Sequence, residues 1–311
     1  MADVILNLLS VTEEEKNDFE TIAPEAEHIY AETDTVKPED LARATVMFGW
    51  PRPESMKNAV NLRWFQTQWA GSDEYQAPGV LPEHVVLTCS GGANARSVAE
   101  HMLASTLALC RRLPRYRDMQ REHIWADESE TRTLLGADVL VAGTGHVGAA
   151  YGKLCQALGA RTTGLKRTVT KVDGFDRVCS MEELDRLLPQ ADVVALVLPH
   201  TPETAGLMDS RRIALMKDDA MLISDGRGSV LDQEALAGAM KSGKLWGAAL
   251  DVTCPEPLPE ESPLWDIPNL LLTPHVAGGM RLEITRKACV RLAQENLRRY
   301  LAGRPLENRV R

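Results

Sequence analysis

The stretch that decides the fold is Gly143-Thr144-Gly145-His146-Val147-Gly148, which directly follows the apolar run Val139-Leu140-Val141-Ala142. A strand, a glycine turn and then a helix, expected from Ala149 to Leu158, is the order that a dinucleotide-binding unit needs. The first glycine permits a tight turn, the second lets the backbone approach a pyrophosphate, and the third lets helix pack on strand. The amides at the start of the helix would face the phosphates. Taken alone, the glycines could also form a structural turn, because glycine-rich turns are common.

Strand-like and helix-like segments alternate on both sides of this turn, which predicts an α/β fold with parallel sheets. After the turn, strands are expected at residues 161–165, 192–198, 220–224, 246–251 and 270–273, and helices at 180–188, 210–216 and 232–242. Before it, strands are expected at residues 4–9, 45–48, 63–66 and 84–88, and helices at 13–22, capped by Thr12, and at 97–112. A last helix is expected at 280–301.

This order of elements predicts two Rossmann-like domains with doubly wound parallel sheets around a central cleft. Residues 1–98 plus 279–311 are expected to form the substrate-binding domain, and residues 99–278 the dinucleotide-binding domain. A length of 311 residues suits two such domains.

Charge and composition narrow the choice of partners. The formal net charge of −9 disfavours nucleic acid and anionic membrane surfaces as partners. The six cysteines are scattered without a CxxC pair or a metal-like Cys/His cluster, so we expect reduced thiols and no metal site. The N-terminus lacks a basic region followed by an apolar core, and no apolar run reaches the length of a membrane span. We therefore expect a cytoplasmic protein.

The end of the second strand after the turn bears on the choice of nucleotide. An acidic residue at this position usually binds the ribose hydroxyls of NAD. Here the strand ends in Lys166-Arg167-Thr168, and the next acidic residue is Asp173. Two cations and a hydroxyl could hold a 2′-phosphate, although Lys-Arg pairs are usually a solvated surface. We therefore favour NADP(H) as the cofactor and keep NAD(H) as possible.

Three further segments lie at or just beyond expected strand ends, where an open α/β sheet places its ligands. They contain, in order, Arg227, Glu256 and His275. An arginine that pins a carboxylate, a histidine that gives a proton and a glutamate that orients the imidazole suit the reduction of a 2-oxo acid. Each residue could also have a purely structural role: Arg227 in a surface ion pair, Glu256 in a turn between prolines, and His275 as a cap.

The chain resembles the D-isomer-specific 2-hydroxyacid dehydrogenases over nearly its full length. Within that family it resembles the branch of the glyoxylate and hydroxypyruvate reductases. Several separate motifs in the right order carry the resemblance: Val98-Ala99-Glu100-His101, the Gly143–Gly148 turn, Leu198-Pro199-His200-Thr201-Pro202-Glu203-Thr204, Arg227-Gly228 with Asp232, Leu250-Asp251-Val252 with Glu256-Pro257, and Thr273-Pro274-His275. The resemblance implies that Arg227, Glu256 and His275 are the catalytic set.

The resemblance also implies which residues bind the cofactor and the substrate. Cofactor-binding positions would be Gly143, Gly145, His146, Val147, Gly148, Lys166, Arg167, Thr168, Pro199, Thr204 and Asp251. Asp251 would contact the nicotinamide carboxamide, or could simply cap its strand. Substrate-binding positions would be Trp50, Trp69, Ala70, Gly71 and Arg227. The substrate would be a small anionic 2-oxo or 2-hydroxy acid, and the family is typically homodimeric through the nucleotide domain, here through residues 111–125.

Two departures from the family pattern stand out. Ser224-Asp225-Gly226 replaces the commoner Asn-Thr-Ala, which places an unexpected carboxyl group beside the catalytic arginine. Trp69 stands where small residues are frequent, so specificity for a glyoxylate-sized substrate stays open.

The leading expectation is an NADP-preferring reductase of glyoxylate-like or hydroxypyruvate-like acids, and several alternatives stay open. A broad 2-ketoacid reductase is one, and a phosphoglycerate dehydrogenase is another, less expected because no regulatory domain follows the catalytic part before Arg311, although short forms exist in the family. Formate dehydrogenase is not expected, since Glu256 stands where that branch carries Gln. A non-catalytic nucleotide-sensing scaffold belongs to a different class, and it would have to explain the intact Arg, Glu and His.

Overall fold

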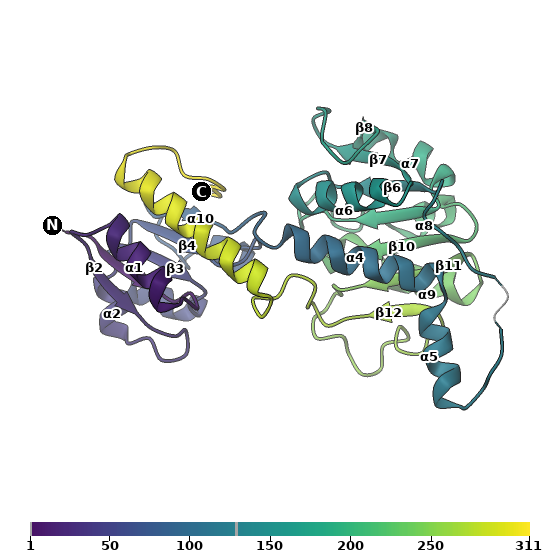
Figure 1. Ribbon diagram of the computed structural model, residues 1–311, viewed down its shortest axis with the longest axis horizontal. Coiled ribbons are helices and arrows are strands. Elements are labelled where there is room, and N and C mark those ends of the chain that lie inside the picture. Colours follow the sequence, from purple (N-terminus) through teal and green to yellow (C-terminus); the bar gives the residue numbers. More distant parts are fainter. Residues whose placement is uncertain (1, 128–129) are drawn as a thin grey trace. The chain divides into compact units, whose positions relative to one another are not determined.

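The structure is a computed structural model that describes residues 2–127 and 130–311. The chain forms two compact units, one made of Met1–Asn94 with Gly279–Arg311 and the other of Ala95–Gly278. Figure 1 shows the elements of both units. The boundary expected after residue 98 falls inside the helix α4 (Ala95–Cys110). The functional roles assigned to the two segments stay predictions.

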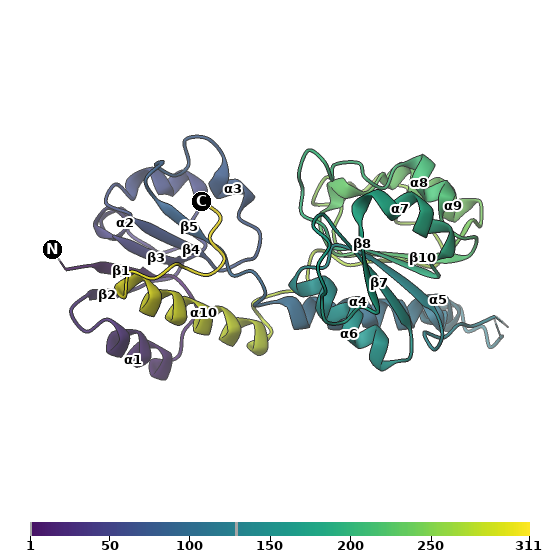
Figure 2. The ribbon, with the colours of Figure 1, turned by 90° about the horizontal axis from the view of Figure 1, so that it is seen from above.

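The first unit is built on a five-stranded parallel sheet in the order β2-β1-β3-β4-β5, which reverses direction between β1 and β3. Its strands are β1 (Val4–Asn7), β2 (Glu27–Tyr30), β3 (Val46–Gly49), β4 (Trp64–Thr67) and β5 (Val86–Thr88). One face of the sheet is covered by α1 (Glu13–Ile22) and α10 (Glu283–Leu301), and the other by α2 (Pro38–Arg43), η1 (Pro53–Asn58) and α3 (Asp73–Gln76) (Figure 2).

Helix α1 begins where the sequence predicts because Thr12 and Glu15 form a reciprocal cap. The Glu15 amide donates to Thr12 Oγ1 at 3.2 Å, and the Thr12 amide donates to Glu15 Oε2 at 2.8 Å. A cap of this kind typically stabilises a helix by about 1 kcal/mol. The phenyl ring of Phe19 is fully buried from this helix against the sheet.

The second unit is built on a seven-stranded sheet in the order β12-β11-β10-β9-β6-β7-β8, with every pairing parallel. The strands are β6 (Asp138–Ala142), β7 (Arg161–Lys166), β8 (Arg177–Ser180), β9 (Val193–Leu196), β10 (Ala220–Ser224), β11 (Leu245–Leu250) and β12 (Leu270–Leu272). The order reverses between β6 and β9, which is the switch point where doubly wound sheets bind ligands.

Helices cover both faces of this second sheet (Figure 2). Helices α4 and α6 (His146–Ala157) pack on one face, and α5 (Leu113–Arg121) follows α4. The other face is covered by α7 (Leu184–Leu187), α8 (Ser210–Leu215) and α9 (Gln233–Lys241). Short turns of 3-10 helix are η2 (Met181–Glu183), η3 (Leu188–Gln190) and η4 (Gly228–Val230). The predicted α/β fold with two parallel sheets is confirmed, and the central cleft stays a prediction.

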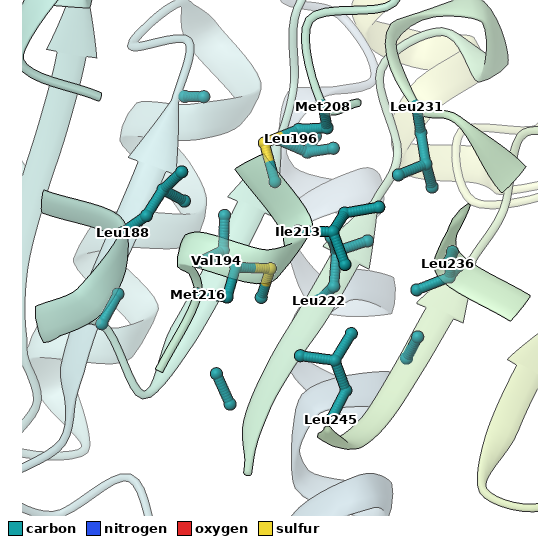
Figure 3. Close-up of a cluster of buried hydrophobic side chains, with 14 of the residues drawn as sticks. Leu188, Val194, Leu196, Met208, Ile213, Met216, Leu222, Leu231, Leu236 and Leu245 are labelled. Carbon is teal, nitrogen blue, oxygen red and sulfur yellow. The ribbon is translucent and has the colours of Figure 1, made fainter. Parts of the chain in front are cut away.

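The core under α7, α8 and α9 shows what fixes the carboxyl ends of the strands. In Figure 3, Val194, Leu196 and Leu222 point from β9 and β10 toward Ile213 and Met216 around α8. Each of these five side chains is at least 98% buried. Burying a side chain of this size contributes about 1.5–3 kcal/mol, so the strand ends form a stable base for the loops that follow them.

The helix expected at residues 180–188 is present as a series of short helical turns, and the strand that precedes it was not expected. Residues 177–180 form the edge strand β8, and residues 181–190 form three short helical turns, η2, α7 and η3. Ser180 accepts a hydrogen bond from the Glu182 amide as a helix cap would, and Pro189 has no amide with which to continue α-helical bonding past Leu188. Strand β2 and the helices α2, α3 and α5 were not assigned individually from the sequence.

Among the described residues, no helix combines the length and apolar character needed to cross a membrane.

Candidate active site

The glycine turn lies at the switch point between β6 and β9. Gly143 has φ of +105°, and a Cβ there would lie 2.6 Å from the Val197 carbonyl oxygen. A Cβ on Gly148 would lie 1.9 Å from the Gly143 carbonyl oxygen, so only glycine allows α6 to approach the turn this closely. A Cβ on Gly145 would meet nothing within 4 Å. Because Gly145 is also the N-cap residue of α6, this open space suits a dinucleotide pyrophosphate.

Four more residues of the predicted cofactor site lie at the start of α6 and in the loop after β9. His146 and Val147 are the first two residues of α6, and His146 is exposed. Pro199 and Thr204 lie in the loop after β9, where Thr204 Oγ1 donates to the Pro199 carbonyl at 2.6 Å. The Thr201 amide donates back to Thr204 Oγ1 at 2.8 Å. These bonds brace the loop beside the switch point.

Positive charge gathers at the tip of β7, the neighbour of β6 in the sheet. Lys166 is the last residue of β7, and its ammonium donates to Thr170 Oγ1 at 2.7 Å. Arg167 and Thr168 follow and are exposed. Strands β6 and β7 pair in register at Ala142 and Leu165, so the basic tip begins beside the residue that leads into the glycine turn. The arrangement leaves Arg167 accessible to an anionic ligand.

Glu256 and His275 form a hydrogen-bonded pair in the loops after β11 and β12. His275 Nδ1 lies 2.9 Å from Glu256 Oε2, and the Thr253 amide donates to Glu256 Oε1 at 3.0 Å. A carboxylate accepts hydrogen bonds, so Nδ1 carries the proton and Nε2 is the ring nitrogen available to exchange one. The His275 side chain is 52% exposed, which leaves the ring open to a reactant.

Asp251 fixes the backbone on both sides of His275. Its Oδ1 accepts from Thr273 Oγ1 at 2.6 Å and from the Val276 amide at 2.9 Å, and its Oδ2 accepts from the Ala277 amide at 3.0 Å. His275 itself has φ of +53°, which an L-residue keeps only where its surroundings impose it. The carboxylate of Asp251 therefore holds the loop that carries His275, and its contact with a nicotinamide carboxamide stays a prediction.

Arg227 lies in the loop after β10, beside the Glu256 loop. It is half-buried, and its Nη1 donates to the Gly226 carbonyl at 3.0 Å. A Cβ on Gly228 would lie 2.1 Å from the Thr253 carbonyl oxygen, so the two loops are in direct backbone contact. The structure thus places Arg227, Glu256 and His275 after three neighbouring strands, β10, β11 and β12.

The predicted substrate-binding residues of the first unit follow its strands β3 and β4. Trp50 packs edge-on against Tyr75, with ring centroids 4.9 Å apart, and against Trp69 at 6.4 Å. Trp50 and Trp69 are half-buried, Ala70 is exposed and Gly71 is half-buried. The grouping of these four residues with Arg227, which belongs to the other unit, stays a prediction.

Three residues of the site received no role from the sequence. Thr253 holds Glu256, Thr273 links Asp251 to the His275 loop, and His101 Nε2 lies 3.1 Å from Thr273 Oγ1. His101 and Thr273 stand in two of the quoted motifs, which was the available signal. Their contact joins residues 172 positions apart, so only the fold reveals it.

A doubly wound sheet with a glycine turn at its switch point defines the class of dinucleotide-binding α/β proteins. Within this class, residues 103–277 match the family described as D-isomer specific 2-hydroxyacid dehydrogenase, NAD binding domain. The chain belongs to the D-isomer specific 2-hydroxyacid dehydrogenase family. It is therefore an enzyme of a family that acts on CH–OH groups with a nicotinamide cofactor.

Two solved structures and one curated relative illustrate the similarity. A D-isomer specific 2-hydroxyacid dehydrogenase from Xanthobacter autotrophicus, in complex with NADPH and MES, is 30% identical with a TM-score of 0.83, over 100% of this chain and 98% of that one. An NADPH-dependent glyoxylate/hydroxypyruvate reductase from Sinorhizobium meliloti, in complex with NADP and sulfate, is 25% identical with a TM-score of 0.82, over 99% and 98%. A D-3-phosphoglycerate dehydrogenase from Synechocystis is 32% identical over 248 residues, which cover 77% of this chain and 43% of that protein.

Proposed function

We propose that the chain is an NADPH-preferring reductase of small 2-oxo acids, with glyoxylate or hydroxypyruvate as the leading substrates. The observation that carries this proposal is the Glu256–His275 pair, with 2.9 Å between carboxylate and imidazole, beside the loop that bears Arg227. The name of the Sinorhizobium reductase supports the substrate class.

Each residue of the pair and its neighbours has a role in the reaction. His275 Nε2 gives a proton to the keto oxygen, while Glu256 holds the other ring nitrogen and stabilises the protonated imidazole. Arg227 binds the substrate carboxylate and draws electron density toward the keto oxygen. The amides of the Trp69–Gly71 loop bind the same carboxylate. When bound, the reduced nicotinamide supplies the hydride that the keto carbon accepts.

The exposed basic tip of β7 supports the preference for NADPH. We expect the double variant Lys166→Ala/Arg167→Ala to raise KM for NADPH at least about tenfold, because the loss of even one charge-assisted hydrogen bond costs about 1.5–3 kcal/mol. KM for NADH, which lacks the 2′-phosphate, is expected to stay within about twofold. Steady-state kinetics with both cofactors measures the difference.

Lys171→Ala provides the matched control, because Lys171 is an exposed lysine of the same loop. It is expected to leave both KM values as they are. Equal losses for NADPH and NADH in the double variant would mean that the basic tip does not read the 2′-phosphate.

Two other activities share the same residues. A broad 2-ketoacid reductase and a phosphoglycerate dehydrogenase would both use Arg227, Glu256 and His275, and the similarity to the Synechocystis protein favours the second. Initial rates of NADPH and NADH oxidation with glyoxylate, hydroxypyruvate, pyruvate, phenylpyruvate and 3-phosphohydroxypyruvate separate them. The proposal expects the highest kcat/KM with glyoxylate or hydroxypyruvate. Turnover with the phosphorylated acid alone would replace it by the phosphoglycerate activity.

A homodimer in the cytoplasm completes the proposal. The segment 111–125 contains α5 and exposes the large apolar side chains of Leu113, Ile124 and Trp125. Exposed apolar groups of this size on one segment are typical of a protein contact. Sedimentation is expected to give twice the 34.2 kDa of one chain, and a mass of 34.2 kDa would rule the dimer out.

A further inference from the structure

Two carboxyl groups lie side by side at the ends of neighbouring strands, Asp225 after β10 and Asp251 after β11. The strands pair in register at Ser224 and Leu250, and the Asp251 amide donates to the Ser224 carbonyl at 3.0 Å. Residues in register on parallel strands point to the same face and lie about 4.8 Å apart. Ile223 and Ala249, two residues before Asp225 and Asp251, belong to the core cluster of α4 and α6, so the alternation along the strands carries both carboxyl groups to that face.

The two carboxyl groups differ in the number of hydrogen bonds that they accept. Asp251 accepts from Thr273 Oγ1 and from the amides of Val276 and Ala277. Asp225 Oδ1 is buried and has no hydrogen-bond partner anywhere in residues 2–127 and 130–311. A negative charge on a carboxyl group with one oxygen buried and without donors is costly, and a charge beside that of Asp251 adds repulsion. The geometry therefore makes Asp251 the charged member of the pair and Asp225 the neutral one.

Other ionisable groups lie on the elements packed around the pair. Helix α6 contributes Tyr151, which burial keeps neutral by raising its pKa far above the usual range, and α4 contributes His101, 3.9 Å from Asp251 Oδ1. Cys155 lies beside Tyr151 on α6, and Arg227 follows in the same loop. Burial, and then the charge of Asp251, raise the pKa of Asp225 to about 8.

We propose that Asp225 is a positioning residue that works in its protonated form and keeps Asp251 as the single negative charge beneath the His275 loop. Loss of the Asp225 proton to solvent would place two carboxylates side by side. Their repulsion would weaken the Asp251 bonds to Val276 and Ala277, and the backbone around His275 would open. The effect of this opening on catalysis rests on the proposed function, whereas the opening itself does not.

The sign of the effect on stability follows from linkage. The pKa of Asp225 is raised in the folded chain from an ordinary value of 3.8, so the folded state holds a proton that the unfolded state releases between these two values. The contribution of Asp225 to stability is therefore complete below pH 3.8 and falls as pH rises toward 8. Asp225→Asn has no proton to lose, so its gain in melting temperature over the natural chain is expected to grow from pH 5 to pH 8.

Hydrogen exchange of the Val276 and Ala277 amides tests the proposal directly. In the natural chain we expect protection relative to the chemical exchange rate to fall about tenfold between pH 6.5 and pH 9, which corresponds to a repulsion of about one pKa unit. Asp225→Asn is expected to keep the same protection at both pH values. Asp266→Asn makes the same change at an exposed aspartate and is expected to behave like the natural chain.

The outcomes separate this inference from the proposed function. Unchanged protection of the two amides in the natural chain between pH 6.5 and pH 9, or the same fall in Asp225→Asn, would overturn the inference whatever the enzyme catalyses. If the chain reduces 2-oxo acids, the ratio of kcat at pH 9 to kcat at pH 6.5 is expected to be higher in Asp225→Asn than in the natural chain. A chain that turns over none of these acids but loses the protection as described would contradict the proposed function alone.

Discussion

Replacing His275 by alanine is expected to lower kcat for 2-oxo acid reduction about a thousandfold, which lies within the range for loss of a general acid. The imidazole is the proposed proton donor, because Glu256 Oε2 lies 2.9 Å from Nδ1 and leaves Nε2 for the substrate. The side chain is 52% exposed, so its removal is not expected to lower the melting temperature. Steady-state kinetics and thermal unfolding on the same preparation measure both effects.

Glu256→Gln separates proton transfer from orientation. An amide can still contact the ring but carries no charge to stabilise the imidazolium, so a loss of about 10- to 100-fold in kcat is expected. His28→Ala removes an imidazole from β2 in the other unit and is expected to keep kcat. If His275→Ala retained more than about a tenth of the natural kcat, His275 would not be the proton donor.

Replacing Gly148 by alanine is expected to destabilise the nucleotide unit by at least about 3 kcal/mol, as overpacking against rigid backbone does. The added Cβ would lie 1.9 Å from the Gly143 carbonyl oxygen and 3.3 Å from a Val141 methyl, and neither the turn nor the strand can move away cheaply. The change would separate α6 from β6 and remove the dinucleotide site. The midpoint of denaturant unfolding measures the loss.

Gly145→Ala is the matched control within the same turn. Its Cβ would meet no atom of the protein within 4 Å, so the unfolding midpoint is expected to stay the same. The added methyl would occupy the space given to the pyrophosphate, so Kd for NADPH is expected to rise at least about tenfold. Equal destabilisation by both substitutions, or unimpaired NADPH binding by Gly145→Ala, would contradict the roles assigned to the two glycines.

The sequence was most informative where a local pattern has a single structural solution. The apolar run before Gly143 and the expected cap at Thr12 both lead directly to elements that the structure contains. Strand β8 is different, because an edge strand of four partly exposed residues carries no periodicity, and Ser180 provides a genuine cap signal at its end. The sequence therefore predicted the helical turns that follow Ser180 but not the strand that precedes them.

Some features of the candidate site could likewise be predicted from the sequence, and others could not. Arg227, Glu256 and His275 could be chosen from the sequence because each follows a strand-like run, and the structure shows the bond between Glu256 and His275. The placement of Asp225 next to Asp251 could not be predicted, because it depends on the register of β10 and β11. A one-residue shift of either strand would place the two carboxyl groups on opposite faces.

The most direct test of the central claim is the fate of the transferred hydrogen. We would reduce hydroxypyruvate with NADPH that carries deuterium at the transferable C4 position and analyse the glycerate by mass spectrometry and chiral chromatography. The account predicts D-glycerate with one deuterium at C2. Glycerate without the label, L-glycerate, or no product under conditions in which NADPH binds would contradict it.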